Sequence, residues 1–574
     1  MSEYILEFKN LGFKYRAQAK PTLYNIDLKI KRGEKLLIAG PSGCGKSTLG
    51  SLINGLIPSS YKGDITGSLL INGKDSKEMS IFDISHIVGT VLQDSDAQFV
   101  GMTVAEDLAF ALENDCVLLP DMRKRVDEVA TTLNLKDFLL HAPGELSGGQ
   151  KQRVSVGGVL ASDVDLFLFD EPLANLDPKT GKQAIELIDE LQKKTGAAVI
   201  IIEHRLEDVL HRSVDRIVLM QEGHIVADES PDELLSKGLL SECGVREPLY
   251  LTALKYAGVS IESKMRPSSI ENLILSDTDK AQLRKFMKEV HKDKKASSKE
   301  KLLETKGLSF TYEKMKKRAL DNISTAVSKG EMVAIVGTNG AGKSTFSKVI
   351  CGMENEDEGQ IFFEGSDFSA LSIKERAAYV GYVMQNPNQM ISKVMIMDEV
   401  AMGLRLRGVP EEEVQEKVTK ALKICGLYTM RNWPISALSY GQKKRVTICS
   451  ILVLEPKVLI LDEPTAGQDY RHYTKIMEFL RQLNRQGITI IMITHDMHLM
   501  LEYADRGIVF SGGKIIADKT CAEILTDSEI VDRASLKETS LYDLANLCGI
   551  EDAATFVQDF IDYERENVRG LCDE

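Results

Sequence analysis

The chain has 574 residues, of which 43% are hydrophobic and 27% are charged, and its formal net charge is −14. This length exceeds what one hydrophobic core supports, so we expect several domains. The acidic balance argues against a protein built to wrap nucleic acid, although it leaves room for a local basic patch. The longest apolar runs, such as residues 197–202 and 488–493, are only as long as strands, and the first residues lack a signal-peptide pattern. Any membrane role is therefore expected to be peripheral.

A phosphate-binding loop is predicted near the N-terminus, after two β-like segments at residues 4–8 and 23–30. Residues 40–48 read Gly-Pro-Ser-Gly-Cys-Gly-Lys-Ser-Thr and fit the pattern G-x-x-x-x-G-K-[ST]. An apolar run leads into the loop and a helix-compatible run leads out of it, which is the context that the motif requires. Its glycines allow several backbone N–H groups to point at one phosphate. Lys46 is expected to reach the β- and γ-phosphates, and Ser47 to hold Mg²⁺.

The whole pattern occurs twice. A second loop, at residues 337–345, again follows an apolar run, and its lysine lies 297 residues after the first. Other motif residues recur at an almost constant distance, which indicates an internal repeat. The pairs 292 residues apart are Gln93 and Gln385, Ser147 and Ser439, Asp170 and Asp462, and Glu171 and Glu463, while His204 and His495 are 291 apart.

The repeat predicts the domain boundaries. Each half is expected to be a nucleotide-binding core followed by a small extension that contains a short helix. We therefore predict five segments, namely domain 1 at 1–232, its extension at 233–263, a polar Lys-rich linker at 264–301, domain 2 at 302–520 and an acidic helical extension at 521–574. The linker has a helical piece around residues 279–290, and it is interpreted as a solvated connector or as a basic segment that touches RNA.

Two acidic residues end a buried strand in each half. The segments 165–172 and 457–464 have four apolar residues, then Asp-Glu-Pro. This suits a parallel sheet whose carboxyl edge faces the nucleotide. The first acid, Asp170 or Asp462, is expected in the Mg²⁺ shell, and the second, Glu171 or Glu463, is placed to polarise an attacking water. Strand-ending acids can also cap helices, but their pairing with a phosphate loop in both halves favours the catalytic interpretation.

A Leu-Ser-Gly-Gly-Gln segment at 146–150, and Leu-Ser-Tyr-Gly-Gln at 438–442, each open a helix that offers a second anion site. The ordered set of phosphate loop, glutamine, this signature, acidic strand and histidine resembles the ATPase subunits of ATP-binding-cassette (ABC) proteins. The resemblance covers nearly the whole chain twice. It implies an α/β fold of two P-loop ABC ATPase domains, each with a small antiparallel β subdomain and a helical signature-motif subdomain.

The resemblance also implies the site residues and cofactors, ATP and Mg²⁺. Glu171, His204, Glu463 and His495 would be catalytic. The residues implied to bind ATP are Tyr15, Gly40, Gly43, Gly45, Lys46, Ser47, Thr48, Gln93, Ser147 and Gly149 in the first half, and Tyr312, Gly337, Gly340, Gly342, Lys343, Ser344, Thr345, Gln385, Ser439 and Gly441 in the second. The implied Mg²⁺ ligands are Ser47, Gln93, Asp170, Ser344, Gln385 and Asp462.

In this family two cassettes meet head to tail, so that each ATP lies between one phosphate loop and the other half's signature helix. One chain with two halves can close both sites internally, and we expect both sites to hydrolyse ATP. Tyr440 stands where the first signature has a glycine, and residues 467–469 read Gly-Gln-Asp where the first half has Asn-Leu-Asp. The tyrosine puts the rate of the Lys46 site in doubt more than its existence.

The segments after the two glutamines, 91–107 and 383–391, resemble those of energy-coupling-factor importers. Such importers join two ATPases to an integral membrane coupling subunit and a substrate-binding membrane subunit, at the cytoplasmic face of the cell membrane. They take up vitamins, vitamin precursors, or cobalt and nickel ions. Asp94, Asp96, Glu106 and Asp107 are interpreted either as an acidic groove for basic coupling helices or as a solvated loop.

The competing class is a tandem ABC ATPase that acts on ribosomes. That class would carry a long basic helical linker and usually a basic surface. Here the net charge is −14, and much of the segment between the cassettes is duplicated in the tail. We therefore favour transport and expect no nucleic-acid partner.

Overall fold

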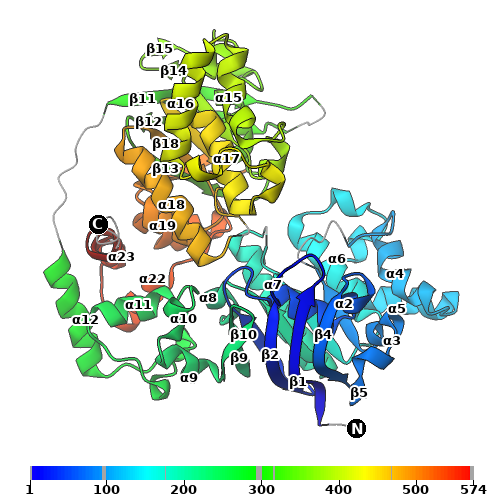
Figure 1. Cartoon of the computed structure of the whole chain (residues 1–574). Coiled ribbons are helices and arrows are strands. Elements are labelled where there is room, and N and C mark those ends of the chain that lie inside the picture. Colours follow the sequence, from blue (N-terminus) through cyan, green and yellow to red (C-terminus); the bar gives the residue numbers. More distant parts are fainter. Residues whose placement is uncertain are drawn as a thin grey trace. The chain divides into compact units, whose positions relative to one another are not determined.

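The computed structural model describes residues 3–92, 98–174, 176–291, 300–313, 317–466 and 468–568. The chain divides into two compact units. The first unit comprises 1–282 with 469–471, and the second comprises 283–468 and 472–574. Figure 1 shows both units.

The first unit contains two sheets. The smaller is antiparallel, with strand order β2-β1-β4-β5. The larger has the order β10-β9-β3-β8-β7-β6, and all of its neighbours are parallel except β9 and β10. The strands are β1 (Tyr4–Tyr15), β2 (Leu23–Lys31), β3 (Lys35–Ala39), β4 (Gly63–Ile71), β5 (Lys74–Asp75), β6 (Val88–Val91), β7 (Leu166–Asp170), β8 (Ala198–Ile202), β9 (Arg216–Gln221) and β10 (His224–Glu229).

Helices surround the larger sheet and build a separate layer beside it. α4 packs against α5 and α6 as the helical subdomain of this unit (Figure 1). The helices are α1 (Lys46–Ile53), α2 (Leu56–Ser59), α3 (Ile81–Ser85), α4 (Val104–Asn114), α5 (Leu119–Thr132), α6 (Gly148–Leu160), α7 (Pro178–Thr195), α8 (Leu206–Val209), α9 (Pro231–Ser236), α10 (Leu239–Glu242) and α11 (Leu249–Tyr256), followed by α12 (Asp277–Val290), which continues into the second unit.

The second unit repeats this architecture, with sheet orders β12-β11-β14-β15 and β16-β17-β18-β13-β19-β20. Its strands are β11 (Lys301–Phe310), β12 (Leu320–Ser328), β13 (Met332–Gly337), β14 (Glu358–Phe363), β15 (Ser366–Asp367), β16 (Val380–Val383), β17 (Val458–Asp462), β18 (Thr489–Ile493), β19 (Arg506–Ser511) and β20 (Lys514–Lys519). Its helices are α13 (Lys343–Ile350), α14 (Ile373–Arg376), α15 (Ile396–Leu406), α16 (Glu411–Ile424), α17 (Tyr440–Leu452), α18 (Tyr470–Arg485), α19 (Met497–Tyr503), α20 (Cys521–Leu525), α21 (Ser528–Arg533), α22 (Ser540–Leu547) and α23 (Ala553–Tyr563). The predicted α/β class, with an antiparallel and a helical part in each half, is thereby confirmed.

One hydrophobic core joins the two sheets in each unit. In the first unit, Phe8 and Phe13 of the antiparallel sheet belong to the same buried cluster as Leu36 and Leu168 of the parallel sheet. The parallel strands are buried over almost their whole length, as expected for a sheet covered on both faces. This shared core fixes the antiparallel sheet against the strand that leads into the phosphate loop.

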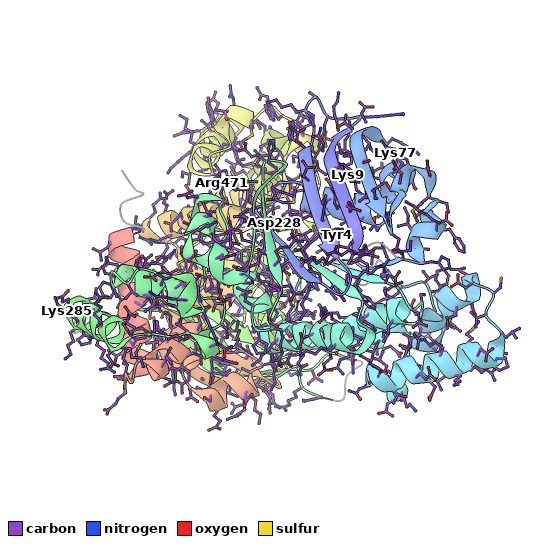
Figure 2. All side chains as sticks on the ribbon, turned by 90° about the horizontal axis from the view of Figure 1, so that it is seen from below. Tyr4, Lys9, Lys77, Asp228, Lys285 and Arg471 are labelled. Carbon is purple, nitrogen blue, oxygen red and sulfur yellow. The ribbon has the colours of Figure 1, made fainter. Side chains whose placement is uncertain are left out.

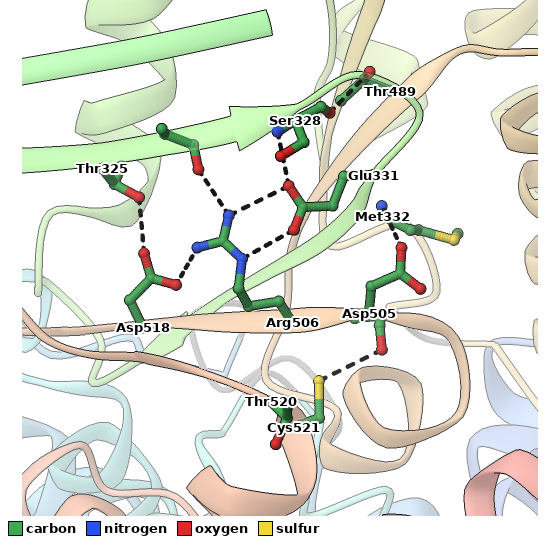
Figure 3. Close-up of polar contacts among 12 residues, drawn as sticks. Thr325, Ser328, Glu331, Met332, Thr489, Asp505, Arg506, Asp518, Thr520 and Cys521 are labelled. Atoms are coloured by element: carbon green, nitrogen blue, oxygen red, sulfur yellow. Dashed lines mark hydrogen bonds and ion pairs between the residues drawn. The ribbon is translucent and has the colours of Figure 1, made fainter. Parts of the chain in front are cut away.

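A charged network also ties the two sheets together. In the second unit, Arg506 on β19 donates from Nε to Glu331 Oε1 at 2.9 Å and from Nη2 to the carbonyl oxygen of Ala326 at 2.7 Å. Its third nitrogen, Nη1, pairs with Asp518 on β20 (Figure 3). Because Ala326 lies on β12, one guanidinium holds the antiparallel sheet to the parallel one.

The first unit has the same network. Arg216 donates from Nε to Glu34 at 2.8 Å, from Nη1 to Asp228 at 2.9 Å and from Nη2 to the carbonyl oxygen of Lys29 at 2.6 Å. Figure 2 labels Asp228 on β10, together with Lys9 on β1 of the smaller sheet. The internal repeat therefore extends to a structural network that the sequence motifs do not include.

The linker contains the predicted helix. α12 spans Asp277–Val290, close to the range of 279–290 that the sequence predicts. Its C-terminal part packs on the extension at the end of the second unit, where Arg284 Nε donates to the carbonyl oxygen of Cys548 at 2.9 Å. His291 Nδ1 lies 2.9 Å from Asp559 Oδ2 on α23. The short helices predicted for the two extensions are present as α11 and α22.

Within the described residues, we find no helix with the length and hydrophobicity that crossing a bilayer requires.

Replacing Arg506 with alanine is expected to destabilise the second unit by about 3 kcal/mol, because the buried Glu331 carboxylate loses its partner. Lysine at this position should restore only part of the loss, since it cannot donate to three groups in the same fork geometry. Denaturant unfolding of the full chain measures the effect.

Arg318 offers the matched control, because it pairs with Glu358 on an exposed surface. Its alanine variant should unfold nearly like the unchanged chain. Equal losses for the two arginines would contradict a special role for Arg506.

Candidate functional site

The first phosphate loop joins β3 to α1. Gly40 has φ 154°, and a Cβ there would lie 2.3 Å from the carbonyl oxygen of Met220, so this position accepts only glycine. Lys46 is buried, and its Nζ donates to the carbonyl oxygens of Gly40 at 2.7 Å and of Pro41 at 2.9 Å. Among the described residues, no side chain caps the N-terminus of α1. The first N–H groups of this helix are therefore left for an anion.

The second phosphate loop has the same geometry between β13 and α13. Lys343 Nζ donates to the carbonyl oxygens of Gly337 and Thr338, both at 2.8 Å. A Cβ on Gly337 would lie 1.9 Å from the carbonyl oxygen of Phe510. In the part of the chain that the structure describes, this helix too begins without a side-chain cap. Two loops of one design are thus built at the carboxyl ends of equivalent strands.

The predicted aromatic residues lie beside these loops. The hydroxyls of Tyr15 and Thr48 are 3.2 Å apart, and so are those of Tyr312 and Thr345. Tyr15 contacts Phe13 of the same strand edge-to-face, and Tyr312, two residues beyond the end of β11, contacts Phe310 in the same way. An aromatic ring is therefore held beside the first turn of the helix that begins with the loop lysine.

The acidic residues follow the strands next to the loops. Asp170 ends β7 and Asp462 ends β17. Asp462 Oδ2 accepts from Ser344 Oγ at 3.1 Å and from the hydroxyl of Tyr382 at 2.9 Å. Asp170 Oδ1 is buried and has no hydrogen-bond partner among the described residues, and burial raises the pKa of this carboxyl while the nearby Ser47 side chain opposes the rise. A serine hydroxyl beside a carboxylate with spare oxygen acceptors fits Mg²⁺.

The glutamates next in sequence have an unusual backbone and a raised pKa. Glu171 has φ 48° and Glu463 has φ 46°, a left-handed conformation that is strained for these residues. Burial, followed by the nearby Glu203, raises the pKa of Glu171 to about 7. Burial, followed by the nearby Asp462, raises the pKa of Glu463 to about 8. Both carboxyls are thus shifted toward the range where a general base operates at neutral pH.

Each histidine lies beside the glutamate of its own half. His204 Nδ1 is 3.8 Å from Glu171 Oε1, and His495 Nε2 is 3.4 Å from Glu463 Oε1. Burial lowers the pKa of His204, which favours the neutral ring. The structure therefore brings together, within each half, the lysine loop, the acidic pair and the histidine that the sequence predicts.

The signature residues lie at the start of another helix. Ser147 and Ser439 are the N-caps of α6 and α17, and each hydroxyl accepts from the backbone N–H three residues later. The hydrogen bonds recorded for these serines remain within this first turn, so among the described residues they do not join their own half's phosphate loop. Gly149 and Gly441 lie in the same turns. Gln93 lies outside the described residues.

The tyrosine in the second signature is linked to the glutamine segment of the same half. The Tyr440 hydroxyl donates to the carbonyl oxygen of Gln385 at 3.3 Å. Lys444, one turn later, is buried, and its Nζ donates to the same carbonyl at 2.7 Å and to that of Met384 at 2.9 Å. The residue at the matching position of the first half is Gln152, which donates to the carbonyl oxygen of Pro172 at 2.7 Å.

The sequence motifs do not identify three side chains beside these groups, namely Glu203, Tyr382 and Lys444. The motifs rest on what the two halves share, and these three residues occupy positions where the halves differ. The matching residues of the other half are Thr494, Thr90 and Gln152 respectively. Comparing the positions at which the two halves differ could have found them, because a polar or charged side chain among buried neighbours is costly without a partner.

Comparison with known proteins gives two family matches. A model described as "ABC transporter" matches residues 23–174 and again 320–466. A second, described as "ATP-binding cassette cobalt transporter", matches residues 237–310.

Similar proteins occur in several bacteria. A protein of Clostridium perfringens named as an ABC transporter ATP-binding protein is 58% identical over 98% of this chain and 98% of its own. One from Enterococcus faecalis with the same description is 54% identical over 99% of both chains. Among solved structures, cbiO1 from Clostridium perfringens, described as part of the ABC transporter complex cbiONQ, is 34% identical over 41% of this chain and 94% of its own, with a TM-score of 0.38.

Replacing Glu463 with glutamine is expected to stabilise the nucleotide-free chain at about pH 8 and to change little at about pH 5. The carboxyl of Glu463 has a pKa of about 8 in the folded chain, against an ordinary value of 4.5. Between these two pH values, the folded chain therefore holds a proton on Glu463 that the unfolded chain releases. The stability of the unchanged chain should therefore fall as the pH rises from about 4.5 to about 8. Thermal unfolding without Mg²⁺ should show a gain at the higher pH of at least about 2–4 °C, the shift that each kcal/mol brings in a unit of this size.

Glu411 is the control, because it is an exposed glutamate of the same unit that pairs with Arg405. That contact lowers its pKa to about 2, so Glu411→Gln should bring no gain at high pH. A Glu463→Gln effect that is equal at both pH values would mean that burial does not hold this proton.

Proposed function

The chain belongs to the ABC transporter family, as a duplicated ATP-binding protein that hydrolyses ATP to drive transport, and from this premise we propose that it energises an importer of the energy-coupling-factor type. The observation that carries the proposal is the pair of hydrolytic centres, each with its loop lysine, acidic pair and histidine in one half. The match of residues 237–310 to a cobalt transporter ATPase model supports the importer class. The cargo would be a vitamin, a vitamin precursor, or a cobalt or nickel ion.

ATP would be bound head to tail between the halves. In one site, Lys46, Ser47, Asp170, Glu171 and His204 would act with Ser439 and Gly441 of the other half. In the second site, Lys343, Ser344, Asp462, Glu463 and His495 would act with Ser147 and Gly149. The geometry supports this arrangement because each signature serine caps a helix start that, among the described residues, is not bonded to its own loop.

Within each site the protein's own groups divide the work. The loop lysine and the free N–H groups of α1 or α13 would hold the phosphates. The serine hydroxyl and the first acid would hold Mg²⁺, which would neutralise phosphate charge. The glutamate, with its raised pKa, would accept a proton from the attacking water, and the histidine beside it would face the γ-phosphate. Tyr15 and Tyr312 would stack on adenine.

An exposed apolar pair beside each glutamine segment would receive the membrane coupling subunit. In the first half, Met102 and Leu140 are 83% and 87% exposed. They are held near one another because the backbone N–H of Val104 donates to the carbonyl oxygen of His141 at 3.0 Å. Large apolar side chains this exposed are typical of interaction sites.

The second half has an exposed apolar pair in the same region, Val394 and Trp433, which are 74% and 50% exposed. Val394 matches Met102, and Trp433 matches His141, the residue after Leu140. Here the backbone N–H of Ile435 donates to the carbonyl oxygen of Val394 at 2.8 Å. The occurrence of the pair in both halves supports one partner with two similar docking segments. We therefore place the chain at the cytoplasmic face of the membrane as a peripheral subunit.

We propose that the chain has two nucleotide-binding domains, at 1–232 and 302–520. Extensions follow them at 233–263 and 521–574, and a linker lies at 264–301. The hydrogen bonds of the linker helix to the C-terminal extension support its role as a docked connector. Leu283 and Met287 of α12 are buried, while its other residues are exposed or partly exposed.

The double variant Glu171→Gln with Glu463→Gln is expected to bind ATP and to lose hydrolysis by at least about a hundredfold, because both proton acceptors are gone. Phosphate release and binding of a fluorescent ATP analogue measure the two effects separately. Glu190→Gln, at an exposed position of α7 outside the sites, should hydrolyse normally. Normal turnover of the double variant would show that these glutamates are not the bases.

Leu140→Glu combined with Val394→Glu is expected to prevent co-purification of integral membrane proteins while leaving ATP hydrolysis by the isolated chain unchanged. Buried charges at a docking surface cost several kcal/mol, of the order of 2–5 per group. The control is Leu118→Glu, an apolar residue 72% exposed at the start of α5. Co-purification of ribosomes with the unchanged chain, without membrane proteins, would favour the alternative function.

A further inference from the structure

Glu203 is a buried carboxylate whose only part in the hydrolytic scheme above is to raise the pKa of Glu171. It follows β8 directly, precedes His204, and is 0% exposed. Its Oε1 accepts from the backbone N–H groups of His204 at 2.8 Å and Arg205 at 3.2 Å. Its Oε2 accepts from the N–H of Leu173 at 3.4 Å. Three donors thus compensate the cost of burying this carboxylate.

The same carboxylate reaches the imidazole ring. Glu203 Oε1 lies 3.2 Å from His204 Nδ1, closer than the 3.8 Å that separates Nδ1 from Glu171 Oε1. A carboxylate this close to Nδ1 favours the tautomer that carries its proton on Nδ1, which leaves Nε2 for another partner.

The second half is built differently at this point. Thr494 occupies the position of Glu203, and its hydroxyl accepts from the backbone N–H of Asp496 at 3.0 Å. The ring of His495 faces its glutamate through the other nitrogen, with Nε2 3.4 Å from Glu463 Oε1. The histidines of the two halves are therefore held by different atoms and by different neighbours.

We propose that Glu203 is a positioning residue for His204, holding the ring through Nδ1 so that Nε2 is available to the γ-phosphate, and that this makes the two hydrolytic centres unlike. The inference rests on the proposed role of His204 in hydrolysis. Beside its effect on the pKa of Glu171, Glu203 acts through the histidine.

Glu203 also couples the histidine to the segment that carries the catalytic glutamate. Its bond from Leu173 is matched by a second link, in which Arg205 Nη2 donates to the carbonyl oxygen of Leu173. Leu173 lies two residues after Glu171. The segments that follow β7 and β8 are thus bonded to each other, which keeps the glutamate and the histidine of this half together.

A mutant cycle on the full chain, made beside Glu463→Gln so that the second centre is silent, tests the proposal by steady-state ATP hydrolysis. Glu203→Thr, which installs the second half's residue, should lower kcat by roughly tenfold, because the carboxylate beside Nδ1 is lost, and change KM for ATP by less than about twofold. Glu203→Gln keeps an oxygen that can accept from Nδ1 and should retain most of the turnover. In a His204→Ala background, Glu203→Thr should cause no further loss.

Glu186 supplies the matched control, because it contacts His211 at 3.1 Å in the same unit but away from the hydrolytic centre. Glu186→Thr should leave kcat unchanged. Turnover is measured against the floor set by the Glu171→Gln, Glu463→Gln double variant. If that double variant hydrolyses normally, the assignment of the ATP sites is wrong, whatever Glu203 does.

The remaining outcomes concern Glu203 alone. An equal further loss in the His204→Ala background, or a Glu203→Thr effect on KM alone, would overturn the proposal in favour of a purely structural cap. If His204→Ala alone already lowers turnover to that of the double variant, the turnover of Glu203→Gln decides between positioning of the ring and a purely structural cap. Turnover near that of the Glu463→Gln chain supports positioning of the ring, and turnover as low as that of Glu203→Thr overturns it.

Discussion

The carboxyl edge of each parallel sheet is the constraint on which the rest of the structure depends. In the order β9-β3-β8-β7, the strands that precede the phosphate loop, the histidine and the acidic pair are direct neighbours. Their ends meet at one edge because the strands run in the same direction. The buried strands, the shared core and the guanidinium network all serve to keep these three ends in register. The strained backbone at Glu171 and Glu463 is tolerated only in such a rigid frame.

Duplication preserves this frame and leaves the surrounding side chains free to diverge. The loop lysines, the tyrosine–threonine contacts and the sheet-joining arginines have nearly the same geometry in both halves. The neighbours of the reacting groups differ, as at Glu203 and Thr494. Hydrogen bonding around the strand-ending carboxylate differs too, since Tyr382 contacts Asp462 where the first half has a threonine. A repeated backbone thus supports two chemically distinct surroundings.

The sequence predicts the fold and most members of the site because their signals are local. A glycine-rich loop between an apolar strand and a helix has few alternative structures, and the constant spacing of its partners orders the remaining strands. The contacts of Glu203 and Lys444 could not be predicted in this way. Their meaning depends on which backbone carbonyl or N–H group lies nearby in space, and Lys444 is 59 residues from the carbonyl of Gln385 that it contacts. The bond between Arg284 and Cys548 depends on contact over an even longer separation.

That last contact constrains the order in which the chain can fold. Arg284 on the linker helix and the carbonyl of Cys548 are 264 residues apart, and Phe286 packs edge-to-face on Tyr563. At a synthesis rate of about 5–20 residues per second, the helix leaves the ribosome on the order of tens of seconds before its binding surface exists. The linker helix can therefore dock only after about 264 further residues have been synthesised. Its docking is a late step in the folding of the second unit.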